Sequence, residues 1–397
     1  MDNQMNIKDL DKKYVLPTYA RGDVEFVSGK NAKLMDSDGK EYIDFTSGIG
    51  VVSVGHANDR VNAAICKQLS EITHTSNLYH IAPQAKAAQK IVDASGFDMK
   101  CFFGNSGAEA NEGAIKIARK FGEINGEVKK YKIITLQNSF HGRTITTVKA
   151  TGQESMHNYF GPFPDGFVYA DSISQVESLL DDHTCAVMIE LVQGEGGVQP
   201  QNKDEVQALA KLLKSKGVLL IVDEVQTGGY RTGKFLASNV YEITPDIVTL
   251  AKGIGGGVPI GVVMTSLKDV LAHGDHGSTF GGNFLSTAAT CEVLDILKEN
   301  HDSGNLEYIT TYFNQELDKL FIENKELFTQ KVGIGLMCGL RAKDADTLGA
   351  IVSSAKENGV MVLKAGRNTL RFLAPLTITK EEIDEGFKSL RNAISSL

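Results

Sequence analysis

One acid and one lysine stand at the ends of two short apolar runs in the middle of the chain. Asp223 follows the run 218–222, and Lys252 follows the run 246–251. Runs of this length and composition predict buried strands of a parallel sheet, and ligands of such sheets bind beyond the carboxyl ends of the strands. A carboxylate at the edge of an apolar core needs a cationic or hydrogen-bonding partner. We therefore expect Asp223 and Lys252 to face one crevice.

An acid and an amine on either side of a planar ring are what pyridoxal phosphate chemistry requires. The lysine binds covalently to the aldehyde of the cofactor, and the acid keeps the pyridine nitrogen protonated so that the ring accepts electrons. Because side chains alternate along a strand, Val225 shares a face with Asp223 and is expected to press on the ring. Gln226 is then placed to donate toward the phenolate oxygen. The pattern predicts pyridoxal 5'-phosphate as the cofactor.

The segment 104–112 follows a predicted strand and opens a predicted helix. Ser106, with Glu109 three residues later, fits a capping box. The same geometry turns the free amides of Gly107 and Ala108 outward at the positive end of a helix, where a phosphate is stabilised. Helix capping and phosphate binding are compatible, so we expect both.

The segment 138–143 follows another predicted strand. A single phenylalanine is usually part of the core, and a single arginine is usually a solvated surface charge. In a crevice that already holds a ring, Phe140 is expected to stack on the face opposite Val225. Arg143 is expected to bind a carboxylate of the substrate.

Two glutamates, Glu190 and Glu195, lie in IELVQGEGG beyond a further strand. Burying them unpaired would be expensive, so at least one of them should find a cation. Arg371 is the candidate cation, and a surface arginine is the alternative.

The segment HGDHGSTFGG contains two histidines, His273 and His276, three positions apart. Two histidines in a glycine-rich loop with no third ligand nearby favour a structural role, so we expect no metal site. The neighbouring hydroxyls of Ser278 and Thr279 are better interpreted as donors to phosphate or substrate.

The elements that must position these residues alternate between strand and helix from residue 100 onward, which predicts an α/β fold with a mostly parallel central sheet and helices on both faces. The predicted strands are 101–103, 132–136, 167–170, 186–191, 218–222, 247–250 and 262–265. Predicted helices between them include 107–121, 174–180 and 203–214, the last closed by Gly217. Residues 23–28 and 32–35 predict two short strands joined by a turn at 29–31. The pattern after residue 283 predicts a smaller α+β domain.

Composition excludes several classes of protein. The chain has 397 residues and a formal net charge of -8. This net negative charge gives no indication of binding to nucleic acid or to an anionic membrane, both of which attract positively charged proteins. Its five cysteines are scattered and form no C-x-x-C pair, which indicates a reducing compartment. The start of the chain is too polar for a signal peptide, and no apolar run approaches the ~20 residues needed to span a bilayer. We expect a cytoplasmic protein with a small-molecule partner.

Together these segments closely resemble the class III pyridoxal-phosphate aminotransferases, specifically the acetylornithine aminotransferase branch. The resemblance is carried by NSGAEANEGAIKIAR, NSFHGRT, VQGEGGV, VDEVQTG, LAKGIGGGVPIG, HGSTFGGN and LRFLAPL, which spread over most of the chain. It implies a fold-type-I homodimer with a large cofactor domain, 46–282, and a small domain formed by both chain ends, 1–45 and 283–397. The expected cofactor-binding residues are Ser106, Gly107, Ala108, Phe140, Asp223, Glu224, Val225, Gln226, Lys252 and, from the neighbouring subunit, Thr279.

The resemblance implies that the terminal amine of N2-acetylornithine passes to the cofactor and then to 2-oxoglutarate, giving glutamate. Lys252 would be the covalent anchor and proton shuttle. Arg143, with Ser278 close by, would bind the distant carboxylate of the donor, and Arg371 would bind the α-carboxylate of 2-oxoglutarate. Glu195 would pair with Arg371 in the first half-reaction and move away in the second. The expected substrate-binding residues are Arg143, Ser278, Arg371 and Glu190.

Two alternatives of other classes remain open from sequence. LLIVDE with GGYRTGK resembles a P-loop nucleotide hydrolase, although Phe235 stands where the Mg²⁺-binding Ser or Thr belongs. A catalytically silent binding module that keeps the fold is the third hypothesis. Within the aminotransferases, succinylornithine, ornithine, γ-aminobutyrate and N-succinyl-diaminopimelate are alternative donors.

Overall fold

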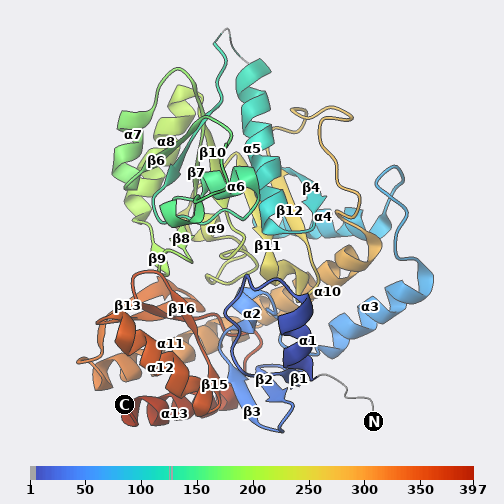
Figure 1. Ribbon diagram of the computed structural model, residues 1–397. Helices are drawn as coiled ribbons and strands as arrows, with labels where there is room; N and C mark the ends of the chain where they lie inside the picture. Colours follow the sequence, from blue (N-terminus) through green and yellow to red (C-terminus); the bar gives the residue numbers. More distant parts are fainter. Residues whose placement is uncertain (1–5, 125, 127) are drawn as a thin grey trace.

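A seven-stranded, mostly parallel sheet forms the centre of the computed structural model, which describes residues 6–397 except 125 and 127 (Figure 1). The strand order is β4-β12-β11-β10-β7-β5-β6. The bounds are β4 Lys100–Gly104, β5 Lys132–Leu136, β6 Phe167–Ala170, β7 Thr184–Ile189, β10 Leu219–Asp223, β11 Ile247–Ala251 and β12 Gly261–Thr265. β12 pairs antiparallel with β11 and β4, and the other pairs are parallel. The predicted fold class is confirmed.

Helices cover both faces of this sheet, which explains why its central strands are apolar throughout. All residues of β7, β10 and β11 are buried. Ile221 of β10 packs in the cluster that contains Ile117 of α5 (Gly107–Ile124). The adjacent residue Val222 packs in the cluster that contains Leu209 of α8 (Lys203–Lys216). Successive side chains of β10 thus pack against helices on opposite faces of the sheet. α8 ends at the predicted Gly217, which has a φ of 61°.

Two four-stranded sheets lie beyond the central one, and one of them combines strands from the N-terminal and C-terminal parts of the chain (Figure 1). It contains β1 (Phe26–Lys30), β2 (Lys33–Asp36), β3 (Glu41–Asp44) and β15 (Val360–Met361), with β15 parallel to β3. The other contains β13 (Phe328–Ile334), β14 (Met337–Ala342), β17 (Thr369–Phe372) and β16 (Leu363–Ala365). The domain boundaries at 46 and 282 stay a prediction.

The turn predicted at residues 29–31 is wrong by about one residue, because β1 continues through Lys30. A Cβ on Gly29 would lie 2.9 Å from the carbonyl oxygen of Lys33 and 3.0 Å from the Cβ of His56. Gly29 therefore permits close approach within a strand, and the turn falls at Asn31, whose φ is 50°.

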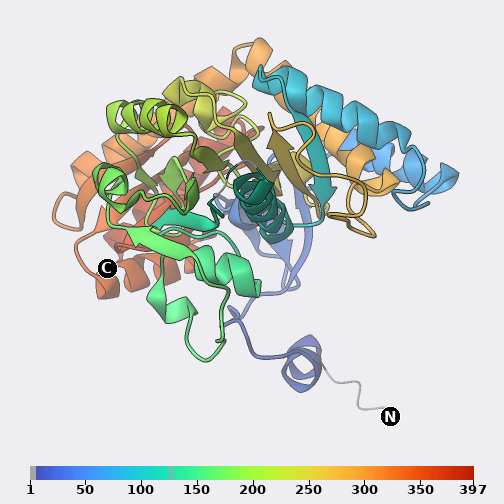
Figure 2. The same ribbon diagram turned by 90° about the horizontal axis from the view of Figure 1, so that it is seen from above.

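The remaining helices pack around these sheets. α10 contacts α3, α4 and α11, and so links the central sheet to the C-terminal elements. α1 has no buried residue and stands away from the body of the molecule (Figure 2). No helix in the described part of the chain is long and apolar enough to cross a bilayer. The bounds are α1 Ile7–Tyr14, α2 Ser47–Gly50, α3 Asp59–Glu71, α4 Ala82–Ser95, α6 Ile145–Ala150, α7 Val176–Leu179, α9 Ala237–Tyr241, α10 Phe284–Asp302, α11 Asn305–Glu323, α12 Ala345–Glu357 and α13 Lys380–Ser395; the two-residue strands β8 and β9 are Val192–Gln193 and Gln199–Pro200.

Candidate active site

A cavity of about 400 Å³ opens at the carboxyl ends of β10 and β11. This volume is in the range of small-molecule sites. Most of the residues singled out in the sequence meet there, although they come from five separate segments. The predicted residues that line it are Ser106, Gly107, Ala108, Phe140, Arg143, Glu190, Asp223, Val225, Gln226 and Lys252.

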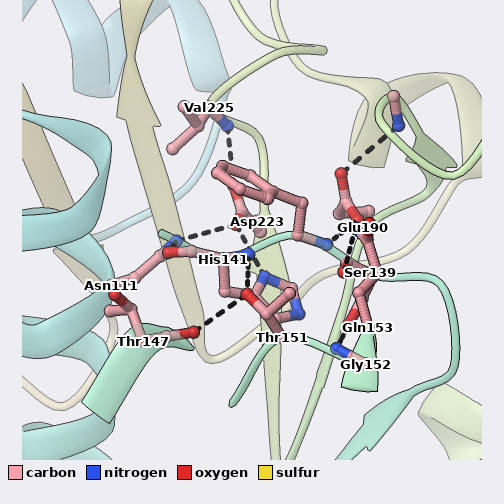
Figure 3. Close-up of polar contacts among 12 residues, drawn as sticks. Asn111, Ser139, His141, Thr147, Thr151, Gly152, Gln153, Glu190, Asp223 and Val225 are labelled. Carbon is pink, nitrogen blue, oxygen red and sulfur yellow. Dashed lines mark hydrogen bonds and ion pairs between the residues drawn. The ribbon is translucent and has the colours of Figure 1, made fainter. Parts of the chain in front are cut away.

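Three donors hold the carboxylate of Asp223 (Figure 3). The Val225 amide donates to Oδ1 at 3.0 Å, and Asn111 Nδ2 donates to Oδ2 at 2.8 Å. His141 Nδ1 also lies 2.8 Å from Oδ2, so the imidazole donates its Nδ1 proton to the carboxylate. Asp223 is only 4% exposed, and these bonds are what a buried carboxylate requires.

Asn111 and His141 both contact the Asp223 carboxylate, and the sequence did not single out either residue. Asn111 Nδ2 also donates to the His141 carbonyl oxygen at 2.7 Å, so the two residues support each other as well as Asp223. The available signal was their position, since Asn111 lies one helical turn after Gly107 and His141 directly follows Phe140. His141 Nε2 is buried and has no hydrogen-bond partner among the described residues.

Lys252 leaves the end of β11 in an unusual backbone conformation. Its φ is 47°, a value that few residues other than glycine adopt. The next residue is held tightly, because Ser53 Oγ donates to the Gly253 carbonyl oxygen at 2.5 Å. Burial lowers the pKa of Lys252 below its ordinary value of 10.5, against the carboxylate of Glu195, which raises it. The turn therefore presents to the cavity an amine that loses its proton more easily than a solvated lysine.

The amino end of α5 forms another wall of the cavity. Ser106 Oγ accepts the Glu109 amide at 3.2 Å, as the predicted capping box requires, but the Glu109 carboxylate accepts the amide of Asn105 rather than that of Ser106. A Cβ on Gly107 would lie 2.7 Å from Val225 Cγ1, which shows how closely the helix approaches the segment that follows β10. The first amides of a helix have no acceptor within the helix, so this end suits a phosphate.

Glu195 forms an ion pair with Arg371, the cation that the sequence indicated for it. Arg371 Nη1 lies 2.6 Å from Glu195 Oε1 and 3.4 Å from Gln226 Oε1, which joins the pair to the cavity wall. The Arg371 side chain is 2% exposed and that of Glu195 is 29% exposed. Burial raises the pKa of Glu195, but the Arg371 charge and hydrogen bond outweigh it, so the pKa lies below its ordinary value.

Glu190 binds backbone amides and forms no ion pair in the described part of the chain. Its Oε2 accepts the Phe140 amide at 2.9 Å, and its Oε1 accepts the Gly194 amide at 3.4 Å (Figure 3). Burial, with a smaller contribution from the Asp223 charge, raises the pKa of Glu190 to about 7. Through these two hydrogen bonds, Glu190 links the segment that contains Phe140 to the loop that contains Glu195.

Glu224 is turned away from the cavity, which corrects its assignment to the cofactor. Its carboxylate accepts the Ala237 and Ser238 amides, each at 2.7 Å, and the Thr227 hydroxyl at 2.7 Å. It therefore caps the amino end of α9. Alternation along the chain sends Glu224 to the face opposite that of Asp223 and Val225.

Arg143, Ser278 and Thr279 lie at the edge of the site. Arg143 is exposed, its guanidinium carbon lies 5.5 Å from the centre of the Phe140 ring, and no carboxylate of the described residues forms an ion pair with it. Ser278 Oγ lies 3.2 Å from Nδ2 of Asn105, a residue that lines the cavity. Thr279 is exposed and is not among the lining residues. The roles assigned to these three residues stay predictions.

The segment GGYRTGK is not built as a phosphate loop. Arg231 is buried within it, and Lys234 is exposed with Nζ 3.4 Å from the Asn239 carbonyl oxygen. In addition, the residues that the structure describes contain no group of three or more His, Cys, Asp or Glu side chains placed to hold a metal ion.

The donor set fits pyridoxal phosphate. An amine of lowered pKa faces the cavity from one strand end, and a buried acid with three donors faces it from the neighbouring strand end. A helix amino end lies beside them, and Gly107 leaves room where a side chain would collide with Val225.

Comparison with known proteins agrees with this geometry. Residues 18–394 match the family model described as aminotransferase class-III. The chain is 59% identical over 389 residues to the acetylornithine aminotransferase of Wolinella succinogenes, covering 98% of this chain and 99% of that protein. The ornithine aminotransferase structure from Toxoplasma gondii ME49 superposes with a TM-score of 0.93 at 34% identity, covering 99% and 96% of the two chains. The N-acetylornithine aminotransferase structure from Stenotrophomonas maltophilia gives a TM-score of 0.83 at 34% identity and 98% coverage of both. The alternative of a P-loop nucleotide hydrolase is thereby excluded, and the chain belongs to the class-III aminotransferase family.

Proposed function

We propose that this enzyme transfers the terminal amino group of N2-acetylornithine to 2-oxoglutarate, giving N-acetylglutamate 5-semialdehyde and glutamate, a step of arginine biosynthesis. Enzymes of this family depend on pyridoxal phosphate. The observation that supports the substrate assignment is the Glu195–Arg371 ion pair beside Gln226, together with Arg143, which lines the cavity and forms no ion pair with a described carboxylate.

Bound at this site, pyridoxal phosphate supplies an aldehyde that takes up an amino group and a ring that accepts the electrons released at the substrate carbon. Asp223, held by Asn111 and His141, would stabilise a protonated ring nitrogen. Lys252 would hold the cofactor covalently, and its lowered pKa suits it to take and return the proton of the substrate carbon.

Two arginines and one movable acid account for the choice between substrates. With Glu195 paired to it, Arg371 is neutralised, so a donor binds through its distant carboxylate at Arg143 and presents its terminal amine. When Glu195 turns away, Arg371 is free to bind the α-carboxylate of 2-oxoglutarate, and Arg143 binds the other carboxylate. Glu195 is partly exposed, which leaves it a route out of the site.

The proposal includes a homodimer in which Thr279 reaches the cofactor phosphate of the neighbouring subunit. The exposure of Thr279 supports this, because its hydroxyl is available to a second chain. A small domain formed by both chain ends and a cytoplasmic location are also part of the proposal.

The test is a donor panel assayed with 2-oxoglutarate and purified holoenzyme. Acetylornithine, succinylornithine, ornithine, γ-aminobutyrate and N-succinyl-diaminopimelate are compared by kcat/KM. The proposal predicts the highest value for acetylornithine. A higher value for any other donor would assign the enzyme to that substrate, and no transfer from any donor would indicate a silent binding module.

A further inference from the structure

A buried arginine without an acidic partner lies in the segment GGYRTGK. Arg231 is 2% exposed, and no carboxylate in the described part of the chain forms an ion pair with it. Its Nη1 donates to the Leu336 carbonyl oxygen at 3.3 Å and to the Ala374 carbonyl oxygen. Burial lowers the pKa of Arg231 to about 10. Since a buried charge is expensive to desolvate, a cation kept here without a counter-charge requires an explanation.

The two carbonyl groups that Arg231 binds belong to the strand pair that carries Arg371. Leu336 directly precedes β14, and Ala374 lies three positions after Arg371, just beyond the end of β17. β14 and β17 are antiparallel, so the start of one lies beside the end of the other. The Arg231 guanidinium therefore bridges the segments that adjoin β14 and β17 at the end of their hydrogen-bonded pairing.

Arg231 belongs to the segment that leaves β10 after Asp223, and its backbone is bonded to the residues that precede β14. The Leu336 amide donates to the Arg231 carbonyl oxygen at 3.0 Å. A Cβ on Gly335 would lie 2.5 Å from the same oxygen, so the two backbones are in direct contact. Arg231 consequently fixes the strand of Arg371 relative to Asp223 through its side chain and its main chain together.

We propose that Arg231 is a positioning residue for the amino acceptor: it holds Arg371 at the place in the site that the α-carboxylate of 2-oxoglutarate requires. This inference rests on the proposed function. Nη1 alone donates to both carbonyl groups, and a guanidinium suits the task because it stays charged when buried, whereas a buried ammonium loses its proton more readily. The donor half-reaction, in which Arg371 is paired with Glu195, depends on Arg143 and is less sensitive.

The two half-reactions of the holoenzyme are therefore compared in Arg231→Lys, Arg231→Met and the control Arg119→Lys. Arg119 also donates to a backbone carbonyl and has no acidic partner in the described part of the chain, but it packs over Phe167 in β6. Both Arg231 variants are expected to lose about tenfold or more in kcat/KM for 2-oxoglutarate, through KM, while kcat/KM for acetylornithine changes less than about threefold. The control is expected to change neither.

Thermal unfolding separates positioning from stability. Removal of the guanidinium leaves the Leu336 and Ala374 carbonyl groups without this donor, so Arg231→Met is expected to unfold at a moderately lower temperature than the wild type, while only its KM for 2-oxoglutarate rises. Equal losses in both half-reactions with a large fall in the unfolding temperature would overturn the inference. So would an unchanged KM in both variants. A wild-type enzyme that transfers no amine contradicts the proposed function, whereas an active wild type with unaffected variants contradicts this inference alone.

Discussion

Glu195→Gln is the substitution that tests the selectivity of the site most sharply. In the wild type the Glu195 carboxylate neutralises Arg371 at 2.6 Å. Glutamine has a similar shape but no charge, so the variant leaves Arg371 permanently available to α-carboxylates. The variant is expected to favour substrates that bind through an α-carboxylate, such as glutamate, over acetylornithine.

The size of the effect follows from the burial of the pair. Arg371 is 2% exposed, and its second contact, with Gln226 at 3.4 Å, is long, so Glu195 is its main partner. A hydrogen bond to a charged group contributes about 1.5–3 kcal/mol, and each 1.4 kcal/mol is about tenfold, so the ratio of the two kcat/KM values is expected to shift by roughly 10–100-fold.

The assay follows the absorbance of the cofactor in single half-reactions, with glutamate and acetylornithine as separate donors. Glu195→Asp is the matched control, because it keeps the charge and shortens the side chain, and it is expected to fall between the wild type and Glu195→Gln. An unchanged ratio in Glu195→Gln would refute the idea that this carboxylate controls access to Arg371.

Three further predictions concern the rest of the site. Lys252→Ala is expected to lose amine transfer by about a thousandfold or more, because it removes the covalent anchor and the proton carrier, whereas Lys234→Ala, which changes an exposed lysine, is expected to keep kcat. Gly107→Ala places a Cβ 2.7 Å from Val225 Cγ1, so the apoenzyme is expected to bind pyridoxal phosphate about tenfold more weakly in a titration followed by absorbance. Because burial raises the pKa of Glu190 from 4.5 to about 7, the folded protein keeps a proton that the unfolded chain releases between these values. The free energy of unfolding of the wild type relative to Glu190→Gln is therefore expected to fall by roughly 1–3 kcal/mol as the pH rises from about 5 to about 8, measured by urea unfolding, and a constant difference would contradict this.

The sequence predicted the ends of the central strands well, because the apolar runs there are short, fully buried and closed by charged residues. β10 and β11 end at Asp223 and Ala251, each one residue beyond the predicted ends at 222 and 250. The proximity of Glu195 and Arg371 also followed from sequence, because two acids near a buried strand end needed a cation.

Contacts between residues that are far apart in the sequence could not be predicted from it. Asn111 and His141 meet Asp223 from 112 and 82 positions away, and no local pattern marks either residue as its partner. At least one of Glu190 and Glu195 was expected to find a cation; Glu195 does, whereas two backbone amides bind Glu190. Adjacent acids such as Asp223 and Glu224 look alike in sequence, and only the direction of the side chains separates a site residue from a helix cap.

The central claim is that Lys252 is the covalent partner of pyridoxal phosphate in a crevice that it shares with Asp223. Reduction of the holoenzyme with borohydride, followed by proteolysis and mass spectrometry, locates the pyridoxyl group directly. The account predicts the label on Lys252 alone and its loss in Lys252→Ala. A label on any other lysine of the wild type, or no label in a protein that binds the cofactor, would contradict it.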